Sequence, residues 1–326
     1  MSSAPDRARF VLAACLAACS GANTDRVPSS ASIIQAAVQA AVRVRATGDL
    51  AQASGSGFFV RAGDGSIYVV TNHHVVWGAT AVTVERSDGI QDTARVLATD
   101  PATDLALLHP ALRSAPATLA FGDDAALRQG DWICALGSPG GVFNAASAGI
   151  VSARGTVPDA AVAGERLVDH LFIDAVVGPG NSGGPVIDSH GRVVGVIAAT
   201  LGNRGLGIAV PGHLAAAVLQ QLAVDGRATH ATLGMQVGDG SLERARGTGV
   251  RVTEVVAGGA ADLAHIQIGD RVLTVDGQPV PPAAALGARA FGLAAGTVWR
   301  VELLRDGQRI TRTIALRDLG DHAVRR

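Results

Sequence analysis

The sequence contains no lysine, few aromatic residues and almost no net charge. Its 27 basic residues are all arginine and stand against 28 acidic ones, so the formal net charge is −1. Without an excess of charge of one sign, the chain has no field that would draw it onto nucleic-acid phosphates or anionic lipid. We therefore expect no nucleic-acid partner.

The composition also excludes a disordered chain. Hydrophobic residues make up 48% of the sequence and charged residues only 17%, a balance that is typical of globular domains. The 326 residues give room for two or three packed units. The 41 glycines, together with many valines, isoleucines and alanines, favour β-barrels with tight turns over long helices.

Cysteine is scarce, with three in the chain. Cys134 lies in an apolar run bounded by glycines, and no histidine is close to it in the sequence. This pattern predicts a small core residue on a strand rather than a nucleophile. If the N-terminal segment is removed and Cys19 is acylated, no internal disulfide framework can form.

The N-terminal residues resemble a secretory signal peptide. Two arginines precede an apolar run that is too short to span a bilayer, and small polar residues follow it. Leu16–Cys19 resembles a bacterial lipobox, in which the chain is cut before a cysteine that is then lipidated; Leu12–Cys15 fits the same pattern with a shorter apolar core. We predict a signal peptide over 1–19, a linker over 20–30 and a lipid anchor on Cys19. An ordinary signal peptide with chance cysteines is the alternative.

Short apolar runs separated by glycine, aspartate, asparagine and proline fill most of the remaining chain. Such regularly spaced strands are typical of a sandwich or barrel. Helix-like spacing occurs over 212–224 and around 282–293. We therefore predict two mostly β domains and a C-terminal tail, over 31–224, 229–318 and 319–326.

A glycine-rich motif carries the strongest chemical signal. In Gly180–Pro185, glycines on both sides of Ser182 let the backbone turn tightly and leave its N–H groups free, as a loop that stabilises an oxyanion requires. The motif lacks the Gly-Lys-Ser/Thr ending of a phosphate-binding loop. Ser182 is the candidate nucleophile, and a purely structural glycine turn is the alternative.

A serine nucleophile needs a base and an orienting carboxylate, and the sequence offers both. His73 and His74 follow an apolar strand, and Asp104 stands just ahead of another, where a carboxylate can be half buried against a base. Alternation along a strand would turn the two histidines in opposite directions. We interpret Asp100, which precedes a proline, as a turn residue.

These motifs resemble those of the trypsin-like serine proteases, and specifically of the HtrA family of bacterial envelope proteases. TNHHVV, DPATDLALL and GNSGGP stand in the family's order, the segments 55–58 and 148–152 also match, and the resemblance covers about 31–318. It implies a chymotrypsin-like double β-barrel protease domain followed by a PDZ domain. It also selects His74, directly before the valine pair, as the base, with Asp104 orienting it and Ser182 as the nucleophile.

The resemblance further implies an oxyanion hole formed by the backbone N–H groups of Gly180 and Ser182. Family members usually carry a polar residue where this chain has Gly178. Glycine at position 178 makes the loop more flexible, so we expect a resting state in which the oxyanion hole is malformed.

The primary specificity pocket is expected from the strand after the nucleophile. By the resemblance, Ala198, Ala199 and Thr200 form its wall and floor. Small side chains without a buried acid cannot neutralise a substrate arginine or lysine. A compact aliphatic substrate residue such as valine, alanine or isoleucine is therefore expected before the scissile bond.

In the second domain, Leu233, Gly234 and Met235 match the PDZ loop whose N–H groups hold a peptide C-terminus while the peptide adds as a strand. Two features depart from the family pattern: His265 stands where glycine is usual, and Gly258-Gly259 replaces a proline-containing turn. We expect bound C-terminal peptides to raise the proteolytic rate. A purely structural β-domain is the alternative.

The resemblance implies an ATP-independent serine endopeptidase of the periplasm or cell envelope that cleaves unfolded or regulatory proteins without a cofactor. A homotrimer is expected, because the family forms trimers and the segment 46–54 lacks the long insertion of cage-forming relatives. A PDZ-based peptide-binding or chaperone protein is the alternative, and an esterase or acyltransferase is a weaker one. No metal site is expected, since no ligand spacing occurs among His109, His170, His190, His213, His230, His265 and His322.

Overall fold

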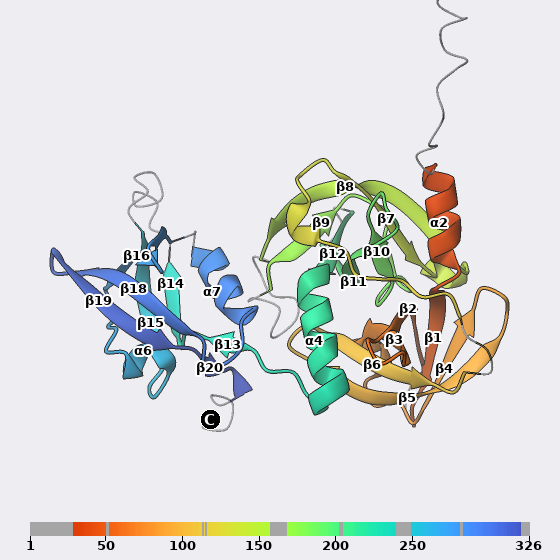
Figure 1. The fold of residues 1–326 in the computed structure, drawn as a ribbon, viewed down its shortest axis with the longest axis horizontal. Coiled ribbons are helices and arrows are strands. Elements are labelled where there is room, and N and C mark those ends of the chain that lie inside the picture. The colour runs from red at the N-terminus through yellow and green to blue at the C-terminus, as the bar shows by residue number, and fades with distance from the viewer. Residues whose placement is uncertain are drawn as a thin grey trace, which may run out of the picture.

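The computed structural model describes residues 29–49, 52–112, 114, 116–156, 168–201, 205–238, 249–280 and 283–320. The expected signal peptide, with Cys15 and Cys19, lies outside the described residues, as does His322. Two bodies are joined by the segment that follows helix α4 (Gly212–Asp225), a larger one with two barrels and a smaller one at the C-terminal end (Figure 1).

The first barrel is a closed sheet of six antiparallel strands. Their order is β1-β2-β3-β6-β5-β4, and β1 pairs with β4 to close the ring. Valine, leucine and phenylalanine side chains from alternate strand positions fill its interior, which excludes water from its centre. The strands are β1 (Ala41–Thr47), β2 (Gln52–Arg61), β3 (Ile67–Asn72), β4 (Ala81–Arg86), β5 (Gln91–Asp100) and β6 (Leu105–Pro110).

The second barrel repeats this design in the order β10-β11-β12-β9-β8-β7. Cys134 lies on β7 and is fully buried, and burial raises the pKa of its thiol to about 11, so the thiol stays protonated at neutral pH. This agrees with a core residue. The strands are β7 (Trp132–Gly137), β8 (Ala145–Gly155), β9 (His170–Ile173), β10 (Pro185–Ile187), β11 (Val193–Leu201) and β12 (Leu206–Pro211), with short 3-10 turns η1 (Asp124–Ala126) and η2 (Pro139–Gly141).

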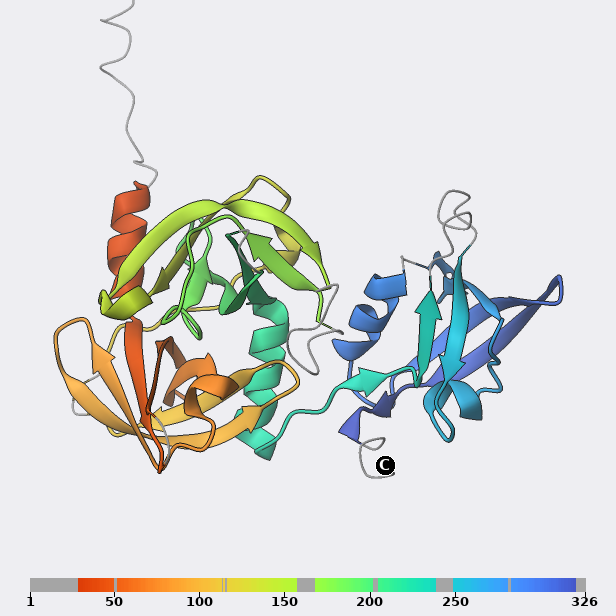
Figure 2. The same ribbon diagram turned by 180° about the vertical axis from the view of Figure 1, so that it is seen from behind.

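Helix α4 agrees with the helix predicted over 212–224, and ends at Gly226, whose φ of +70° is the left-handed conformation of a helix C-cap. Its apolar face joins a core that also contains Leu105 and Val196, one from each barrel. Seen from the front and from behind, α4 lies on the side of the barrels that faces the smaller body (Figures 1 and 2).

Helix α2 (Ser30–Val38) is a feature that the strand pattern does not predict. Ser29 caps it by accepting the Ser32 N–H at 3.3 Å, and Ala37, Ile33 and Ile34 pack against the central core. The predicted run of strands from residue 31 therefore begins with a helix.

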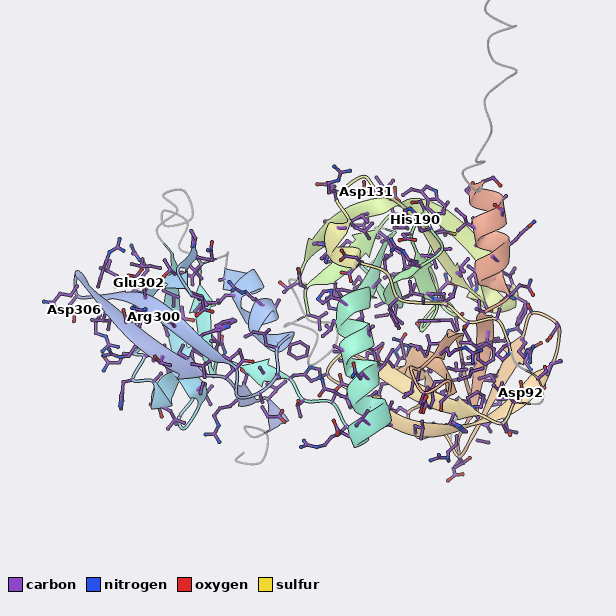
Figure 3. All side chains as sticks on the ribbon, in the orientation of Figure 1. Asp92, Asp131, His190, Arg300, Glu302 and Asp306 are labelled. Atoms are coloured by element: carbon purple, nitrogen blue, oxygen red, sulfur yellow. The ribbon has the colours of Figure 1, made fainter. Side chains whose placement is uncertain are left out.

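The smaller body is built on a six-stranded sheet, in which β14-β15-β16-β18-β19 follow one another and β17 pairs with β16, and it also contains a short and a longer helix. Arg300, Glu302 and Asp306 mark its β18–β19 hairpin, which extends away from the barrels (Figure 3). Its elements are β13 (Ala231–Thr232), β14 (Met235–Gly238), β15 (Val250–Val255), α6 (Ala260–Leu263), β16 (Arg271–Val275), β17 (Gln278–Pro279), α7 (Ala283–Phe291), β18 (Val298–Arg305), β19 (Gln308–Ala315) and β20 (Arg317–Asp318).

The mostly β fold and the double barrel are thus confirmed. Among the described residues, no helix has both the length and the apolar character needed to cross a bilayer.

Candidate active site

The structure brings His74 and Asp104 together at the end of the first barrel. His74 lies in the helical turn α3 (His73–Val76) that follows β3, and Asp104 immediately precedes β6, the strand paired with β3. The His74 Nδ1 atom is 2.6 Å from Asp104 Oδ2, and the backbone N–H of His74 donates to Asp104 Oδ1 at 2.9 Å. The Asp104 side chain is 9% exposed and that of His74 is 50% exposed, so the carboxylate is shielded while the imidazole is accessible.

Asp104 is held in an uncommon backbone conformation. Its φ is +56°, in the left-handed region, where a residue other than glycine needs support from its surroundings. Its carbonyl oxygen accepts the Asn72 Nδ2 group at 2.8 Å and the His73 N–H at 3.0 Å. Asn72 is fully buried, so the TNHH segment positions the aspartate as well as supplying the imidazole.

A helical turn, and not alternation along a strand, determines which of the two histidine side chains faces Asp104. His73 and His74 are the first residues of α3, so the expectation that a strand would point them in opposite directions is wrong. The carboxylate of Asp104 contacts His74, whereas His73 contributes its backbone N–H and its Nδ1 atom has no hydrogen-bond partner among the described residues.

Ser182 lies in the second of two consecutive tight turns, between β9 and β10. The Asn181 N–H donates to the Gly178 carbonyl at 3.0 Å, and the Gly184 N–H donates to the Asn181 carbonyl at 2.9 Å. Gly180 has a φ of +102° and Gly183 a φ of +85°, so each turn has the positive φ at its third residue that defines type II. Ser182 is the second residue of the second turn, and its hydroxyl donates to the Ala198 carbonyl at 3.4 Å.

The expected malformed loop is not what the structure contains. Pro179 restricts φ at the second position of the first turn, and its carbonyl accepts the Gly140 N–H at 3.0 Å. The peptide unit is planar and trans, so the Gly180 N–H points away from η2. The Gly180 carbonyl accepts the Ser56 hydroxyl at 2.6 Å. These contacts order the loop despite its glycines, while Gly178 has open space around it and imposes no constraint.

A cavity of about 280 Å³ opens beside Ser182. Ala199 and Thr200 line it as expected, but Ala198 does not, because its side chain is buried in the central core. Alternation along β11 places Ala198 on the face opposite to Ile197 and Ala199, and the β11–β12 register is irregular at this point. The full lining is Val177, Gly178, Pro179, Ser182, Ile197, Ala199 and Thr200, of which the sequence did not suggest Val177 or Ile197.

The predicted carboxylate loop of the second domain precedes β14, an end strand of the described sheet. Gly234 has a φ of +64°, and a Cβ atom there would lie 2.9 Å from the Ala260 nitrogen, so the position requires glycine. The carbonyls of Leu233 and Gly234 accept N–H groups of Ala261 and Val256, both at 2.9 Å. Leu233 is buried in the domain core, and Met235 begins the strand.

Both departures from the family pattern have a local explanation. His265 has a φ of +56°, just after the end of α6, which is a conformation that glycine adopts more easily. Gly258 has a φ of +72°, and its N–H donates to Asp262 Oδ2 at 2.7 Å. The glycine and this hydrogen bond shape the turn without a proline.

Asp100, which ends β5 shortly before Asp104, contacts the second domain. As interpreted from the sequence, it shapes a turn, since its Oδ2 accepts the Thr103 hydroxyl at 2.5 Å. The same oxygen is 2.8 Å from His230 Nε2, and the His230 ring stacks on Phe291 of α7 with centroids 4.2 Å apart. Burial alone would raise the pKa of Asp100, but the hydrogen bond and charge of His230, together with hydrogen bonds from Thr103 and Ala102, outweigh burial and lower the pKa. The sequence did not suggest this contact.

Within the described ranges, no group of three or more His, Cys, Asp or Glu side chains is placed to hold a metal ion.

Comparison with known families and proteins agrees with this arrangement. A trypsin-like peptidase domain model matches residues 55–196, and a PDZ domain model matches residues 221–295. A relative from Pseudomonas putida, described as a probable periplasmic serine endoprotease DegP-like, is 35% identical over 285 residues, covering 84% of this chain and 58% of the relative. A relative from Rhizobium meliloti with the same description is 36% identical over 267 residues, covering 79% and 52%. The chain thus spans about half the length of the curated relatives it matches.

Solved structures are similar over nearly the whole described chain. The HtrA-type protease AlgW with a tripeptide has a TM-score of 0.76 at 29% identity, covering 89% of this chain and 97% of that one. The serine endoprotease from Yersinia pestis has a TM-score of 0.67 at 28% identity, covering 90% and 99%.

Proposed function

We propose that this chain, which belongs to the HtrA-type trypsin-like serine proteases with one PDZ domain, is an ATP-independent serine endopeptidase. The observation that carries the proposal is the 2.6 Å contact between His74 and a buried Asp104, on the barrel opposite the doubly turned loop that presents Ser182. A base, a carboxylate that orients it and a serine hydroxyl are the groups that acyl transfer to serine requires.

In the proposed reaction, Ser182 Oγ attacks the substrate carbonyl carbon and gives its proton to His74. Because Nδ1 faces Asp104, Nε2 is the nitrogen that accepts it. His74 returns this proton to the leaving amine as the peptide bond breaks, which leaves an acyl-enzyme that water hydrolyses by the same steps in reverse order. Asp104 fixes the tautomer and stabilises the imidazolium.

The negative charge of the tetrahedral intermediate is assigned to the N–H groups of Gly180 and Ser182. Two ordered turns support this assignment, because preorganised donors stabilise developing charge without reorganising during the reaction.

The cavity beside Ser182 is proposed to take the substrate side chain before the scissile bond. Its side chains are aliphatic apart from Ser182 and Thr200, and none is acidic. Small aliphatic residues such as valine, alanine and isoleucine fit its chemistry, whereas arginine or lysine would lose hydration without gaining a partner.

The second domain is proposed to bind peptide C-termini at Leu233, Gly234 and Met235, with the peptide adding as a strand along β14. Unfolded or regulatory proteins are the proposed substrates. The naming of the relatives as periplasmic supports a periplasmic or envelope location, with Cys19 as the proposed lipid anchor. Mass spectrometry of the mature N-terminus tests the anchor, and a free N-terminus beyond Cys19 would contradict it.

A homotrimer is the proposed assembly, and its mass in solution by light scattering tests it. A monomer at micromolar concentration would contradict the proposal.

Labelling with a fluorophosphonate probe tests the proposed activity directly. The wild-type protein should be labelled at Ser182 and should degrade unfolded casein, and Ser182→Ala should do neither. Casein left intact by a folded, unlabelled wild-type protein would refute the proposal and favour peptide capture without proteolysis.

A further inference from the structure

Ser56, on β2 of the first barrel, is a buried serine whose polar groups are all engaged. It is 1% exposed and stands between Gly55 and Gly57, far from Ser182 in the sequence. None of its four hydrogen bonds is to a neighbouring residue of its own strand.

Two of these bonds reach the residues on either side of Asn181. The Ser56 hydroxyl donates to the Gly180 carbonyl at 2.6 Å, and the Ser56 N–H donates to the Ser182 carbonyl at 2.8 Å. Gly180 and Ser182 are the two residues whose N–H groups are proposed to form the oxyanion hole. One residue of the first barrel therefore binds the carbonyl oxygens of both residues that are proposed to supply the oxyanion donors.

The other two bonds fix Ser56 itself. Its hydroxyl accepts the Ser138 N–H at 2.9 Å, and its carbonyl accepts the Thr71 hydroxyl at 2.7 Å. The hydroxyl thus bridges the Ser138 and Gly180 backbones, with its proton committed to Gly180 because the Ser138 N–H can only donate.

The glycines that flank Ser56 make this close approach possible. A Cβ atom on Gly55 would lie 2.9 Å from the Ser182 carbonyl oxygen, and one on Gly57 would lie 2.6 Å from the Val70 carbonyl oxygen. Larger residues at either position would push β2 away from the loop or from β3, and the grip on the loop would be lost.

We infer that Ser56 is a positioning residue that keeps the oxyanion loop in its catalytic shape. Gly180 can rotate about both φ and ψ, and its conformation is fixed only if the peptide units before and after it are held. The Gly140 N–H holds the unit before it through the Pro179 carbonyl, and Ser56 holds the unit after it. This inference rests on the proposed function, because it assigns Ser56 a part in the same reaction.

The test compares Ser56→Ala with Ser138→Ala in the full chain. Ser138 is also buried, but its hydroxyl makes no hydrogen bond among the described residues and its backbone N–H is retained in the variant. Kinetics on a short peptide substrate with an aliphatic residue before the scissile bond should show kcat reduced about 10- to 100-fold in Ser56→Ala with KM within about twofold, somewhat less than the loss of an oxyanion donor itself. Ser138→Ala should lose less than threefold.

Melting temperature and binding of a C-terminal peptide verify that both variants are folded. Ser56→Cys provides a graded third variant, since a thiol keeps a proton to donate but is a weaker donor and is larger than a hydroxyl, and its kcat should lie between those of wild type and Ser56→Ala. If Ser56→Ala does not fold, the comparison of Ser56→Cys with wild type carries the test.

A folded Ser56→Ala or Ser56→Cys with wild-type kcat would overturn the inference, as would equal losses in Ser56→Ala and Ser138→Ala. An inactive wild-type enzyme would instead refute the proposed function, so the two failures are distinguishable. A rise in KM at constant kcat would show that Ser56 serves substrate binding and would also overturn the positioning role.

Discussion

Two loops of this chain are proposed to hold negative charge with backbone N–H groups, and the structure supports them to different degrees. In the protease loop, the carbonyl of every residue from Gly178 to Ser182 accepts a hydrogen bond, and the donors include Gly140 and Ser56 from other segments. In the PDZ loop, the carbonyls of Leu233 and Gly234 are held by residues of the same domain.

The difference matches what each loop is proposed to do. Stabilising an intermediate requires donors that are fixed before the charge forms, so the loop is held from both barrels. Capturing a peptide end is a binding event in which the peptide itself completes the sheet beside β14. We expect substitutions in the first loop to affect kcat and those in the second to affect peptide affinity.

The largest expected effect is the loss of the nucleophile or base. Ser182→Ala and His74→Ala should each reduce kcat by about 10⁴- to 10⁶-fold, because the residues of such a triad act as a unit. His73→Ala should retain most activity, since the His73 contribution to Asp104 is its backbone N–H. Peptidase kinetics with melting curves check this, and an equal loss in two folded histidine variants would contradict the assignment of His74.

Gly180→Ala should break the protease loop without touching the PDZ loop. The φ of Gly180 is +102°, and a Cβ atom there would lie 2.5 Å from the Ser138 carbonyl oxygen. We expect kcat to fall about 10²- to 10³-fold, as for loss of an oxyanion donor, with C-terminal peptide binding unchanged. Isothermal titration and peptidase assays on one preparation measure both, and unchanged kcat would show that the turn is not needed.

Gly234→Ala is the matched change in the PDZ loop. Its Cβ atom would clash with Ala260 at 2.9 Å and Gly259 at 3.0 Å, so we expect at least tenfold weaker binding of C-terminal peptides, equivalent to about 1.4 kcal/mol. The kcat on a short peptide should remain that of wild type. A fall in both properties would mean that the two loops are coupled in the resting enzyme.

A smaller effect is expected from the peptide itself. A peptide with a free, apolar C-terminus should raise kcat/KM by about fivefold, the lower end of typical couplings, because the protease loop is already ordered. The C-terminal amide should not, since it lacks the charge that the PDZ loop binds. The Gly234→Ala variant is the control, since its rate should not respond to the peptide. If the rates with the free-acid peptide and with its amide are identical at saturating peptide, the second domain only tethers substrate and does not activate the protease.

The smallest expected effect concerns stability. His265→Gly should raise the free energy of unfolding by about 0.5 kcal/mol, because the relief of a left-handed backbone exceeds the entropy that glycine adds. Denaturant unfolding followed by fluorescence measures it, with peptidase activity unchanged. Destabilisation would show that the His265 side chain contributes a contact worth more than the strain.

The sequence predicted the parts of the site that depend on local pattern. The histidine pair His73-His74 follows one recognisable apolar run, Asp104 precedes another, and the glycines around Ser182 indicate tight turns, while the family resemblance selected His74. The regular spacing of short strands predicted a sandwich or barrel, and the resemblance to the HtrA family implied the double barrel.

The remainder depends on contacts between distant residues. Ser56 reaches Gly180 across 124 positions and His230 reaches Asp100 across 130, and no local pattern encodes such a pairing. The position of Ala198 follows instead from alternation along β11, which turns its side chain away from the face of Ile197 and Ala199. The glycines around Ser182 predicted a flexible loop. That prediction failed because the hydrogen bonds that hold the carbonyls of Pro179 and Gly180 come from Gly140 and Ser56, which are distant in the sequence.

Through the contact between Asp100 and His230, the second domain contributes to the free energy of unfolding of the first domain. A chain cut at residue 229 loses the imidazole partner of a buried carboxylate and removes Phe291 from the core that the barrels share with α4. Removing one partner of a buried pair typically costs about 3 to 5 kcal/mol, and losing a buried phenylalanine costs a similar amount. The isolated barrels should therefore melt at a lower temperature than the barrels of the full chain, whatever signal the second domain transmits.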